Sequence, residues 1–306
     1  MPNKAPRNKT LELSLSEIDK LADKALRLEK KTSLKTLNNQ VIWQDAFEAL
    51  DYLPNAFVDL MIVDPPYNLN KNFGNSAFKM MRENDYAEWL DSWLKKTIRL
   101  LKDNASVYIC TDWRSSISVP YVASKYLILQ NRISWEREKG RGAQNNWKNC
   151  LEDIWFFTKS KNYKFNIDAV KILRPVLAPY TDTKGKPKDW FEKKHQKLRL
   201  TYPSNIWTDI SVPFWSMIEN TPHPTQKPEK LIAKLILASS DENDMVFDPF
   251  LGSGTTAVTA KKLKRRYLGI EKEKEYIAYA IKRLAMAEED PKIQGVSGGI
   301  FLARNM

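Results

Sequence analysis

Residues 58–68 have the sequence VDLMIVDPPYN. Five of the first six residues are apolar, and an acid, two prolines and a tyrosine follow them. A short apolar run that stops at such breakers predicts a buried strand. In a doubly wound sheet, ligands bind beyond the carboxyl ends of the strands. We therefore expect Asp64, Pro65, Pro66 and Tyr67 to face a cleft at the end of this strand.

Strand and helix patterns alternate on both sides of this stretch. The expected strands are 41–43, 106–110, 245–247 and 267–270, and the expected helices are 45–53, 86–101, 228–238, 255–263 and 274–286, with a turn at 102–104. From about residue 131 to 222 the helical periodicity fades and prolines cluster. This order predicts an α/β fold with one doubly wound, mostly parallel, Rossmann-like sheet that is assembled from both ends of the chain.

The patterns divide the chain into an N-terminal helical extension, two halves of the sheet domain and an insertion between them. The extension is residues 1–36, the catalytic half of the sheet domain is 37–130, the insertion is 131–222, and the cofactor-binding half is 223–306. In the extension, Ser14 and Glu17 have the spacing of a capping box. The apolar residues behind them predict a helix over residues 14–31.

Composition limits the class of protein. The 306 residues contain no run of 18 apolar residues, and no apolar segment follows the charged N-terminus, so neither a membrane span nor a signal peptide is expected. Two cysteines and two histidines are too few for a disulfide framework or a Cys/His zinc site. These features predict a cytoplasmic, reduced protein that binds no metal.

The net charge of +12 is unevenly distributed. Residues 132–199 contain 17 Lys and Arg against 8 Asp and Glu, a surplus of 9, with tryptophans and tyrosines between them. A solvated basic surface is one interpretation of this segment. A concentrated basic segment with aromatic residues is more typical of proteins that follow a phosphate backbone.

A second motif is VFDPFLGSGTTA, residues 246–257. Gly252 and Gly254 lie between an expected strand and an expected helix, and Glu271 ends the next strand. Glycines allow a ligand to approach the backbone closely, and an acid at this place can accept hydrogen bonds from ribose hydroxyls. The pattern fits a nicotinamide dinucleotide or another adenosine-bearing cofactor, and a tight strand–helix turn is the purely structural alternative. A phosphate-binding P-loop is disfavoured because no Lys-Ser/Thr pair follows the glycines.

Three motifs in this order, DPPY, HPTQKP at residues 223–228 and FLGSG, resemble those of the S-adenosylmethionine-dependent DNA amino-methyltransferases of the permuted β group. The resemblance extends from about residue 41 to about residue 285. It implies S-adenosylmethionine as the cofactor and a DNA target-recognition role for the insertion. The implied cofactor-binding residues are Asp45, Thr225, Gln226, Lys227, Asp248, Pro249, Phe250, Gly252, Ser253, Gly254, Thr255, Thr256 and Glu271.

Two of these assignments depend most on the family pattern. Asp45 matches a carboxylate near the adenine amine of the cofactor, although the usual glycine before it is Gln44 here. A helix N-cap is the structural alternative for Asp45. Lys227 belongs to the segment that lines the methionine end of the cofactor, where a cation would face the cofactor's carboxylate.

The chemistry of an exocyclic adenine amine explains the DPPY stretch. Its lone pair is delocalised into the ring, and two acceptors that hold both N–H groups would localise it. Asp64 supplies one acceptor and the carbonyl of Pro65 the other, since consecutive prolines fix the backbone. Tyr67 offers a face on which a flipped-out base can stack. Asp64, Pro65, Pro66 and Tyr67 are therefore the predicted catalytic residues.

The predicted partner is double-stranded DNA, with a cognate restriction endonuclease and a homodimer as further partners to test. Side chains suited to DNA contacts are Arg141, Asn145, Asn146, Lys184, Lys186, Lys188 and Arg199. Three alternatives stay open: N4-cytosine methylation, a nicotinamide-dependent oxidoreductase, and a catalytically silent DNA-binding protein. The Asp at position 64 favours adenine, because cytosine enzymes of the family more often have Ser there.

Overall fold

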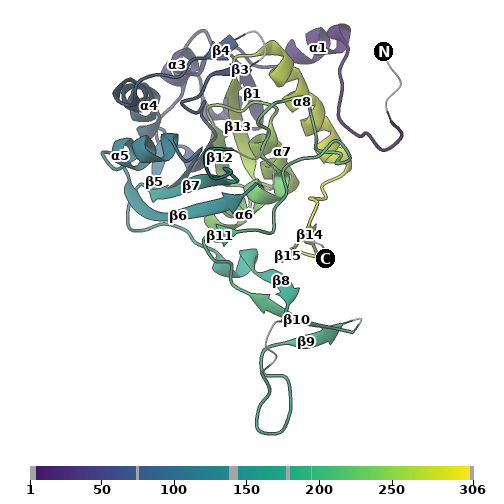
Figure 1. Ribbon diagram of the computed structural model, residues 1–306. Helices are drawn as coiled ribbons and strands as arrows, with labels where there is room; N and C mark the ends of the chain where they lie inside the picture. The colour runs from purple at the N-terminus through teal and green to yellow at the C-terminus, as the bar shows by residue number, and fades with distance from the viewer. Residues whose placement is uncertain (1–4, 74–75, 138–143, 177–179, 194, 304–306) are drawn as a thin grey trace.

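The computed structural model describes residues 5–73, 76–137, 144–176, 180–193 and 195–303 (Figure 1). Its centre is an eight-stranded sheet in the order β1-β13-β12-β2-β5-β7-β6-β11. The strands are β1 (Gln40–Trp43), β13 (Arg266–Glu271), β12 (Met245–Asp248), β2 (Val58–Val63), β5 (Leu101–Thr111), β7 (Leu151–Thr158), β6 (Ile128–Glu136) and β11 (Ile206–Trp207). The first five are parallel to one another, and β7 is antiparallel to both of its neighbours. The predicted mostly parallel sheet, built from both ends of the chain, is confirmed.

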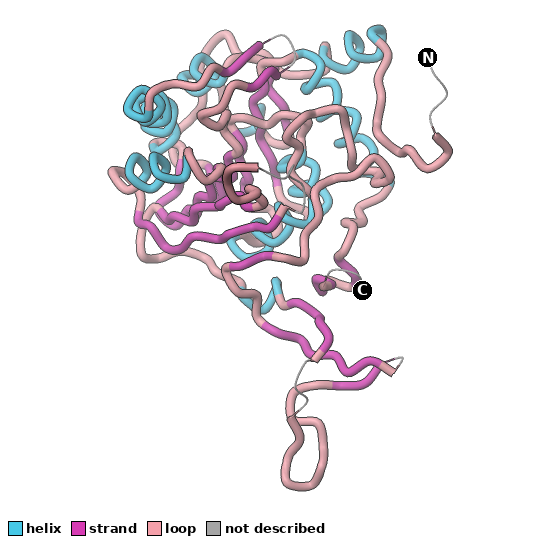
Figure 2. Tube along the Cα trace, in the orientation of Figure 1, coloured by secondary structure: helices cyan, strands magenta, loops and turns pink. Residues whose placement is uncertain are grey.

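Helices cover both faces of this sheet (Figures 1 and 2). One face packs against α3 (Ala46–Ala49), α4 (Glu83–Ile98) and α5 (Ser118–Ala123), and the other against α6 (Glu229–Ser239), α7 (Thr255–Lys262) and α8 (Lys274–Glu289). The reason lies in the two-residue period of β2: Met61 and Val63 belong to the first core, and Leu60 and Ile62 to the second. All six residues of β2 are buried, as a strand covered on both faces requires.

A smaller sheet protrudes from the central domain, at the bottom of Figure 1. It has the order β14-β15-β8-β10-β9. Its strands are β8 (Ile172–Pro175), β9 (Phe191–Lys193), β10 (Gln196–Thr201), β14 (Val296–Ser297) and β15 (Ile300–Leu302). The C-terminal segment thus adds two strands to a sheet that begins more than a hundred residues earlier in the chain.

The boundaries of the predicted insertion do not coincide with the edge of the central sheet. Residue 131 lies inside β6, and β6, β7 and β11 are strands of the central sheet. The sequence does not reveal the β6–β7 pairing, because antiparallel strands without a helix between them carry no alternating β-α signal. Within the predicted insertion, β8, β9 and β10 lie outside the central sheet. They form the smaller sheet together with β14 and β15, which the prediction assigned to the cofactor-binding half.

Two local predictions also need correction. The capping box of Ser14 and Glu17 is confirmed, but α1 covers only Leu15–Ala22, because Leu26 leaves the helix and exchanges backbone hydrogen bonds with Val41 and Trp43 of the sheet edge. The expected turn at residues 102–104 lies within β5. There the register against β2 shifts, and the Lys102 ammonium group pairs with the buried Asp59 at 2.8 Å.

Short elements complete the described chain: α2 (Leu34–Leu37), β3 (Lys71–Phe73), β4 (Ser76–Phe78) and 3₁₀ turns at residues 50–52, 115–117 and 167–170. The hairpin β3–β4 follows the DPPY stretch directly. Among the described residues, no helix has both the length and the apolar character needed to cross a membrane.

Candidate active site

An acid follows or ends each of the five parallel strands at their carboxyl edge. The five are Asp45 after β1, Asp64 after β2, Asp112 after β5, Asp248 at the end of β12 and Glu271 at the end of β13. All five line one cavity of about 350 Å³, which is within the usual size of a small-molecule site. Parallel neighbours bring their carboxyl ends to the same edge, so residues more than two hundred positions apart share this cavity.

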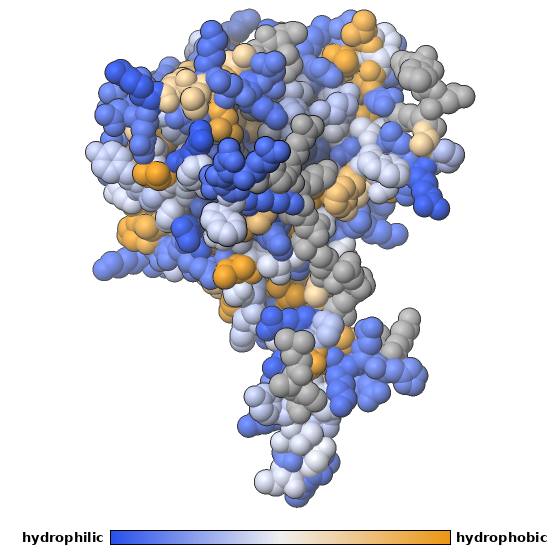
Figure 3. Space-filling model, viewed as in Figure 1, coloured by the Kyte–Doolittle hydropathy of each residue, from blue (hydrophilic) through white to orange (hydrophobic). Residues whose placement is uncertain are grey.

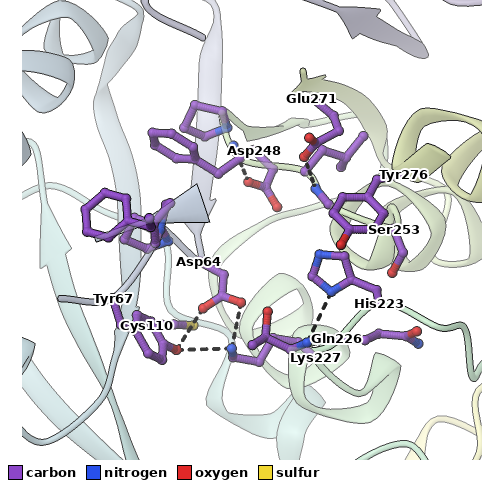
Figure 4. A pocket seen from close by; sticks show the side chains of 18 of the residues that line it. Asp64, Tyr67, Cys110, His223, Gln226, Lys227, Asp248, Ser253, Glu271 and Tyr276 are labelled. Atoms are coloured by element: carbon purple, nitrogen blue, oxygen red, sulfur yellow. Dashed lines mark hydrogen bonds and ion pairs between the residues drawn. The ribbon is translucent and has the colours of Figure 1, made fainter. Parts of the chain in front are cut away.

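Most of the predicted site residues meet in this cavity. The four residues of the DPPY stretch line it, as do all the predicted cofactor-binding residues except Gly254. Figure 4 shows two groups of side chains across the cavity: Asp64, Tyr67 and Lys227 on one side, and Ser253, Glu271, His223 and Tyr276 on the other. The predicted catalytic and cofactor-binding motifs therefore face one space.

Asp64 is the centre of the first group. Its Oδ1 accepts a hydrogen bond from the Tyr67 hydroxyl at 2.8 Å, and its Oδ2 accepts one from Lys227 Nζ at 2.6 Å. Lys227 Nζ lies 3.1 Å from the Tyr67 hydroxyl oxygen as well. Burial, followed by the charges of Asp64 and Glu152, raises the pKa of Tyr67 well above its usual value, so the phenol keeps its proton.

Lys227 has a second carboxylate partner in Glu152 of β7, whose Oε2 lies 3.3 Å from Nζ. The Lys227 and Glu152 side chains are only 6% and 5% exposed, so each charge needs a close counter-charge. Burial lowers the pKa of Lys227, but Asp64 and Glu152 outweigh it, and the pKa stands above its ordinary value. Arg137 of β6 completes the array, with Nη1 at 2.7 Å from Glu152 Oε1.

The loop that follows the strand is fixed by side chains from other elements. The Tyr86 hydroxyl, on α4, donates to the carbonyl of Pro66 at 2.9 Å. The side chain of Asn68 exchanges two hydrogen bonds with the backbone of Met81, and the Asn68 amide donates to Ser115 Oγ at 2.9 Å. Together with the two proline rings, these contacts hold the DPPY backbone in one conformation.

The glycine turn forms the opposite side of the cavity. Gly252 has φ +54°, and a Cβ there would lie 2.9 Å from His223 Nε2, so a side chain at this position would be strained and would press on the His223 ring. The Gly252 amide donates to Glu271 Oε2 and the Glu273 amide to Glu271 Oε1, both at 2.8 Å. Each carboxylate oxygen still has a second lone pair with which to accept a hydrogen bond.

Arg283 of α8 supports this turn from behind. Its Nη1 donates to the carbonyl of Ser253 at 2.8 Å and to Thr255 Oγ1 at 3.0 Å, and its Nη2 pairs with Glu229 at 3.1 Å. At 3% exposure, Arg283 is part of the core rather than of the cavity surface. The sequence prediction missed it, because a lone Arg in a helix resembles any solvated charge.

Two carboxyl groups of the cavity are strongly affected by burial. Burial raises the pKa of Asp248 to about 7, against the hydrogen bonds that it accepts from Thr256 Oγ1 at 2.6 Å and from the Phe250 amide at 3.0 Å. Burial also raises the pKa of Glu271 to about 7. Phe250 itself packs against Trp89 and Trp93 of α4. Asp248 thus braces the start of α7, while Glu271 is open to the cavity.

The segment 223–227 connects the two groups. The His223 ring packs edge-on against Tyr276 with centroids 4.4 Å apart, and burial lowers its pKa to about 3, so the ring is neutral. Gln226 is held by the Thr221 hydroxyl at 2.6 Å and by the Glu219 carbonyl at 2.6 Å. The ammonium group of Lys227 faces Asp64 and Glu152, which differs from the expectation that it faces the carboxylate of a cofactor. A buried cation is stabilised by these two carboxylates.

Asp45 has the helix-capping role that was its structural alternative, and it also lies at the cavity. It is the N-cap of α3, where its Oδ1 accepts a hydrogen bond from the Phe47 amide at 2.8 Å, and it also lines the cavity. The neighbouring Gln44 side chain exchanges two hydrogen bonds with the backbone of Leu28. Gln44 therefore connects β1 to the N-terminal segment. It stands where the family pattern that the sequence resembles usually has a glycine.

Glu152 and Arg137 are also residues of the site that the sequence prediction missed. A signal was present: in β7 the residues at positions 152, 154 and 156 are buried, and Glu152 takes a place on the face where Ile154 and Phe156 lie. A carboxylate on the buried face of a strand is rarely without a counter-charge. The counter-charge, Lys227, is 75 residues away in the chain and could not be paired with it from sequence.

The predicted DNA-contact residues are spread over two exposed regions. Asn145 and Asn146 lie in the β6–β7 connection, whose ends Arg137 and Asn149 line the cavity. Lys184, Lys186 and Lys188 are exposed in the segment 180–190 between β8 and β9, which a β-bridge between Thr181 and Pro187 closes into a hairpin. This protruding hairpin lies at the bottom of Figures 1 and 3. Arg199 is engaged with Asp189 at 2.8 Å, and Arg141 lies outside the described residues.

Known proteins resemble this chain over most of its length. A family model described as DNA methylase matches residues 58–282. The Type II methyltransferase M.HpaI of Haemophilus parainfluenzae is 34% identical over 257 residues, which cover 81% of this chain and 74% of that protein. The DNA adenine methyltransferase YhdJ of Escherichia coli (strain K12) is 34% identical over 254 residues, covering 81% of this chain and 83% of that protein.

Solved structures show the same fold. The PvuII DNA methyltransferase (cytosine-N4-specific) has a TM-score of 0.59 at 19% identity and covers 88% of this chain and 90% of its own. The M1.HpyAVI–SAM complex has a TM-score of 0.51 at 24% identity, with coverage of 80% and 98%. At this identity the likeness concerns the arrangement of sheet and helices.

Proposed function

Because this chain belongs to the DNA methylase family of N6- and N4-amino-methyltransferases, we propose that it methylates N6 of an adenine flipped out of duplex DNA at a specific sequence. The observation that carries the proposal is the place of Asp64. Its carboxylate lines the same cavity as Gly252 and Glu271, which form the side that suits a cofactor. An oxidoreductase would not explain this pairing of sites.

The residues on the glycine side fit S-adenosylmethionine. The backbone cradle at Gly252 admits close approach, Glu271 keeps acceptor sites for ribose hydroxyls, and the cavity is lined by acids that suit a cation. We assign Glu271 to the ribose and Asp45, at the neighbouring strand end, to the adenine amine. When bound, the cofactor supplies a methyl group that is already activated by a sulfonium. Catalysis is then chiefly alignment of two reactants.

On the DPPY side, the chain's own groups prepare the amine. Asp64 accepts one amino hydrogen and the Pro65 carbonyl accepts the other, which localises the nitrogen lone pair. Tyr67 presents its ring to the base, and stacking of about 1–3 kcal/mol offsets part of the cost of extruding the base. Because the Tyr86–Pro66 contact and the proline rings fix this loop, the acceptors need no rearrangement of the backbone.

Adenine is favoured over cytosine by the acid at position 64, where cytosine enzymes of the family more often have Ser. The relative YhdJ, named a DNA adenine methyltransferase, supports the same choice. The names of M.HpaI and M1.MboII, both Type II methyltransferases, support a role beside a restriction endonuclease. A cognate endonuclease and a homodimer stay predictions.

Sequencing of modified bases tests this function in cells. DNA from a methylation-deficient host that expresses the chain should carry N6-methyladenine at one short sequence, and DNA from the host with an empty vector should not. N4-methylcytosine alone would contradict the choice of base while preserving the class. Unmodified DNA from cells that contain the folded protein would contradict the function.

We further propose that the protruding hairpin contacts DNA phosphates. Asp182 shapes its tip, where its Oδ1 accepts hydrogen bonds from the amides of Lys184 and Lys186, both at 2.9 Å. The segment that contains this turn protrudes from the central domain (Figure 1), and Lys184, Lys186 and Lys188 on it are exposed. Arg199, by contrast, is already paired with Asp189. The lysines of the tip are thus the better candidates for phosphates.

Replacing Lys184, Lys186 and Lys188 with Ser should weaken DNA binding and flatten its salt dependence. Each lost phosphate contact lowers the slope of log affinity against log salt by about 0.9. Fluorescence anisotropy over a range of salt concentrations measures both quantities, and calorimetry should show unchanged cofactor affinity. The matched control replaces three exposed lysines of the N-terminal segment, Lys30, Lys31 and Lys35. Equal slopes for the hairpin variant and the control would place DNA elsewhere.

A further inference from the structure

The hydroxyl of Tyr67 faces two carboxylates but has one hydrogen. It lies 2.8 Å from Asp64 Oδ1 and 3.2 Å from Glu152 Oε2. A phenol can donate to only one acceptor at a time. The shorter distance assigns the hydrogen to Asp64 in the free protein, which leaves Glu152 as a second acceptor within hydrogen-bond distance.

This arrangement affects the capacity of Asp64 to bind a substrate amine. In the free protein both of its oxygens are engaged, Oδ1 by Tyr67 and Oδ2 by Lys227. Each oxygen keeps a second lone pair, but a carboxylate that already accepts two short hydrogen bonds, one of them from an ammonium group, is a weaker acceptor for a third. If the Tyr67 hydroxyl turns its hydrogen toward Glu152, Asp64 Oδ1 becomes free. This change needs only a rotation about the C–O bond of the phenol and no movement of the backbone.

Glu152 is held where this exchange requires it. Glu152 lies on β7, and the next residue, Asp153, pairs with Thr111 of β5. The backbone of Glu152 is therefore part of the central sheet. Arg137 fixes Oε1 at 2.7 Å, which leaves Oε2 directed at Tyr67 and Lys227. Two acids, Asp64 and Glu152, and two cations, Lys227 and Arg137, give the array no net charge.

We propose that Glu152 is a positioning residue for methyl transfer: it accepts the Tyr67 hydrogen bond when the target amine reaches Asp64. The proposal rests on the function proposed above, since it requires Asp64 to accept an amino hydrogen. Only hydrogen bonds exchange, and no covalent bond of the protein forms or breaks. The raised pKa of Tyr67 agrees with a phenol that keeps its proton throughout. A buried counter-charge for Lys227 is the purely structural alternative, and it needs no exchange with Tyr67.

A double-mutant cycle of Glu152 and Tyr67 distinguishes a positioning residue from a plain counter-charge for Lys227. In Glu152→Gln, the single amide oxygen faces Arg137, and the amide NH2 then faces Tyr67, so nothing accepts the hydroxyl hydrogen. We expect kcat to fall about 10–100-fold with the KM for DNA and the affinity for S-adenosylmethionine nearly unchanged. In Tyr67→Phe no hydroxyl occupies Oδ1, and adding Glu152→Gln there should lower kcat by less than about threefold. Contacting residues commonly show coupling of this size.

Two further variants make the result interpretable. Glu152→Asp keeps the charge beside Lys227 and Arg137 but withdraws the acceptor from Tyr67, and it should show the same dependence on the Tyr67 hydroxyl. Asp209→Asn is the matched control: Asp209 is a partly buried carboxylate that pairs with Lys230 and Lys234, and it does not line the cavity. Its substitution should have the same effect in the wild-type chain and in the Tyr67→Phe variant. Thermal unfolding checks that each variant is folded.

If each Glu152 substitution lowers kcat by the same factor in the wild-type chain and in the Tyr67→Phe variant, the proposal is overturned and Glu152 is only a counter-charge. Full activity of both Glu152 variants would overturn it as well. Failure of the proposed function is a different result, because the wild-type chain itself would then transfer no methyl group to DNA in the same assay.

Discussion

Asp64→Ala should lower the rate of methyl transfer by about 10³-fold or more and leave the affinity for S-adenosylmethionine nearly unchanged. Removing one pre-positioned hydrogen-bonding group that acts on the reacting atoms commonly costs about 10²–10³-fold, and here the same group also orients the base. The cofactor side of the cavity does not depend on Asp64, whose partners are Tyr67 and Lys227. Single-turnover rates with labelled cofactor, together with calorimetry, measure the two effects separately.

Two variants serve as controls for Asp64→Ala. The first is Asp64→Asn, which retains the shape of the side chain and should also be nearly inactive. In both Asp64 variants, Lys227 retains Glu152 at 3.3 Å, so the buried cation keeps a counter-charge. Glu271→Ala should show the opposite pattern, with weaker cofactor binding and a transfer rate that recovers at saturating cofactor. If Asp64→Ala keeps most of its activity, the assignment of the catalytic site is wrong.

Gly254→Ala should lower the free energy of unfolding by roughly 2–5 kcal/mol, the sum of left-handed strain and overpacking. Gly254 has φ +90°, and a Cβ there would lie 2.7 Å from the Cβ of Ala280 and 2.8 Å from its Cα. Helix α8 cannot move away easily, because Ala280 is fully buried. The displaced turn carries Ser253 and Gly252, so we also expect cofactor affinity to fall more than about 100-fold.

Gly298→Ala is the matched control for this prediction. Gly298 has φ +55°, but nothing lies within 4 Å of the place its Cβ would take. It should therefore lose only the roughly 1–2 kcal/mol of a left-handed conformation and keep its cofactor affinity. Thermal unfolding and calorimetry compare the two variants. Equal losses in both would mean that contact with Ala280 does not matter and that the glycine turn is more tolerant than its packing indicates.

The part of the site that lies on parallel strands was predictable from the sequence. Apolar runs that end in Asp64, Asp248 and Glu271 are local patterns, and the parallel fold brings their carboxyl ends together without further information. The cofactor motif and the DPPY stretch therefore met in one cavity as expected. Asp45, which follows the edge strand β1, was assigned from the family resemblance instead.

The rest depends on pairings that no local pattern reveals. Glu152 belongs to β7, which joins the sheet through antiparallel pairing with β5 and β6. Its contact with Lys227 connects two segments that the prediction had assigned to different domains. The small sheet likewise requires β15 to pair with β8, more than a hundred residues earlier. Such pairings are decided by tertiary packing, which propensity and periodicity do not encode.

One transfer experiment with the purified chain tests the proposed reaction most directly. Methyl-labelled S-adenosylmethionine and duplex DNA are incubated with the protein, the DNA is digested to nucleosides, and the labelled nucleoside is identified by mass spectrometry. We predict label in N6-methyladenine with the wild-type chain and none with Asp64→Ala. DNA without label, from a wild-type chain that binds both the cofactor and DNA, would contradict the proposal.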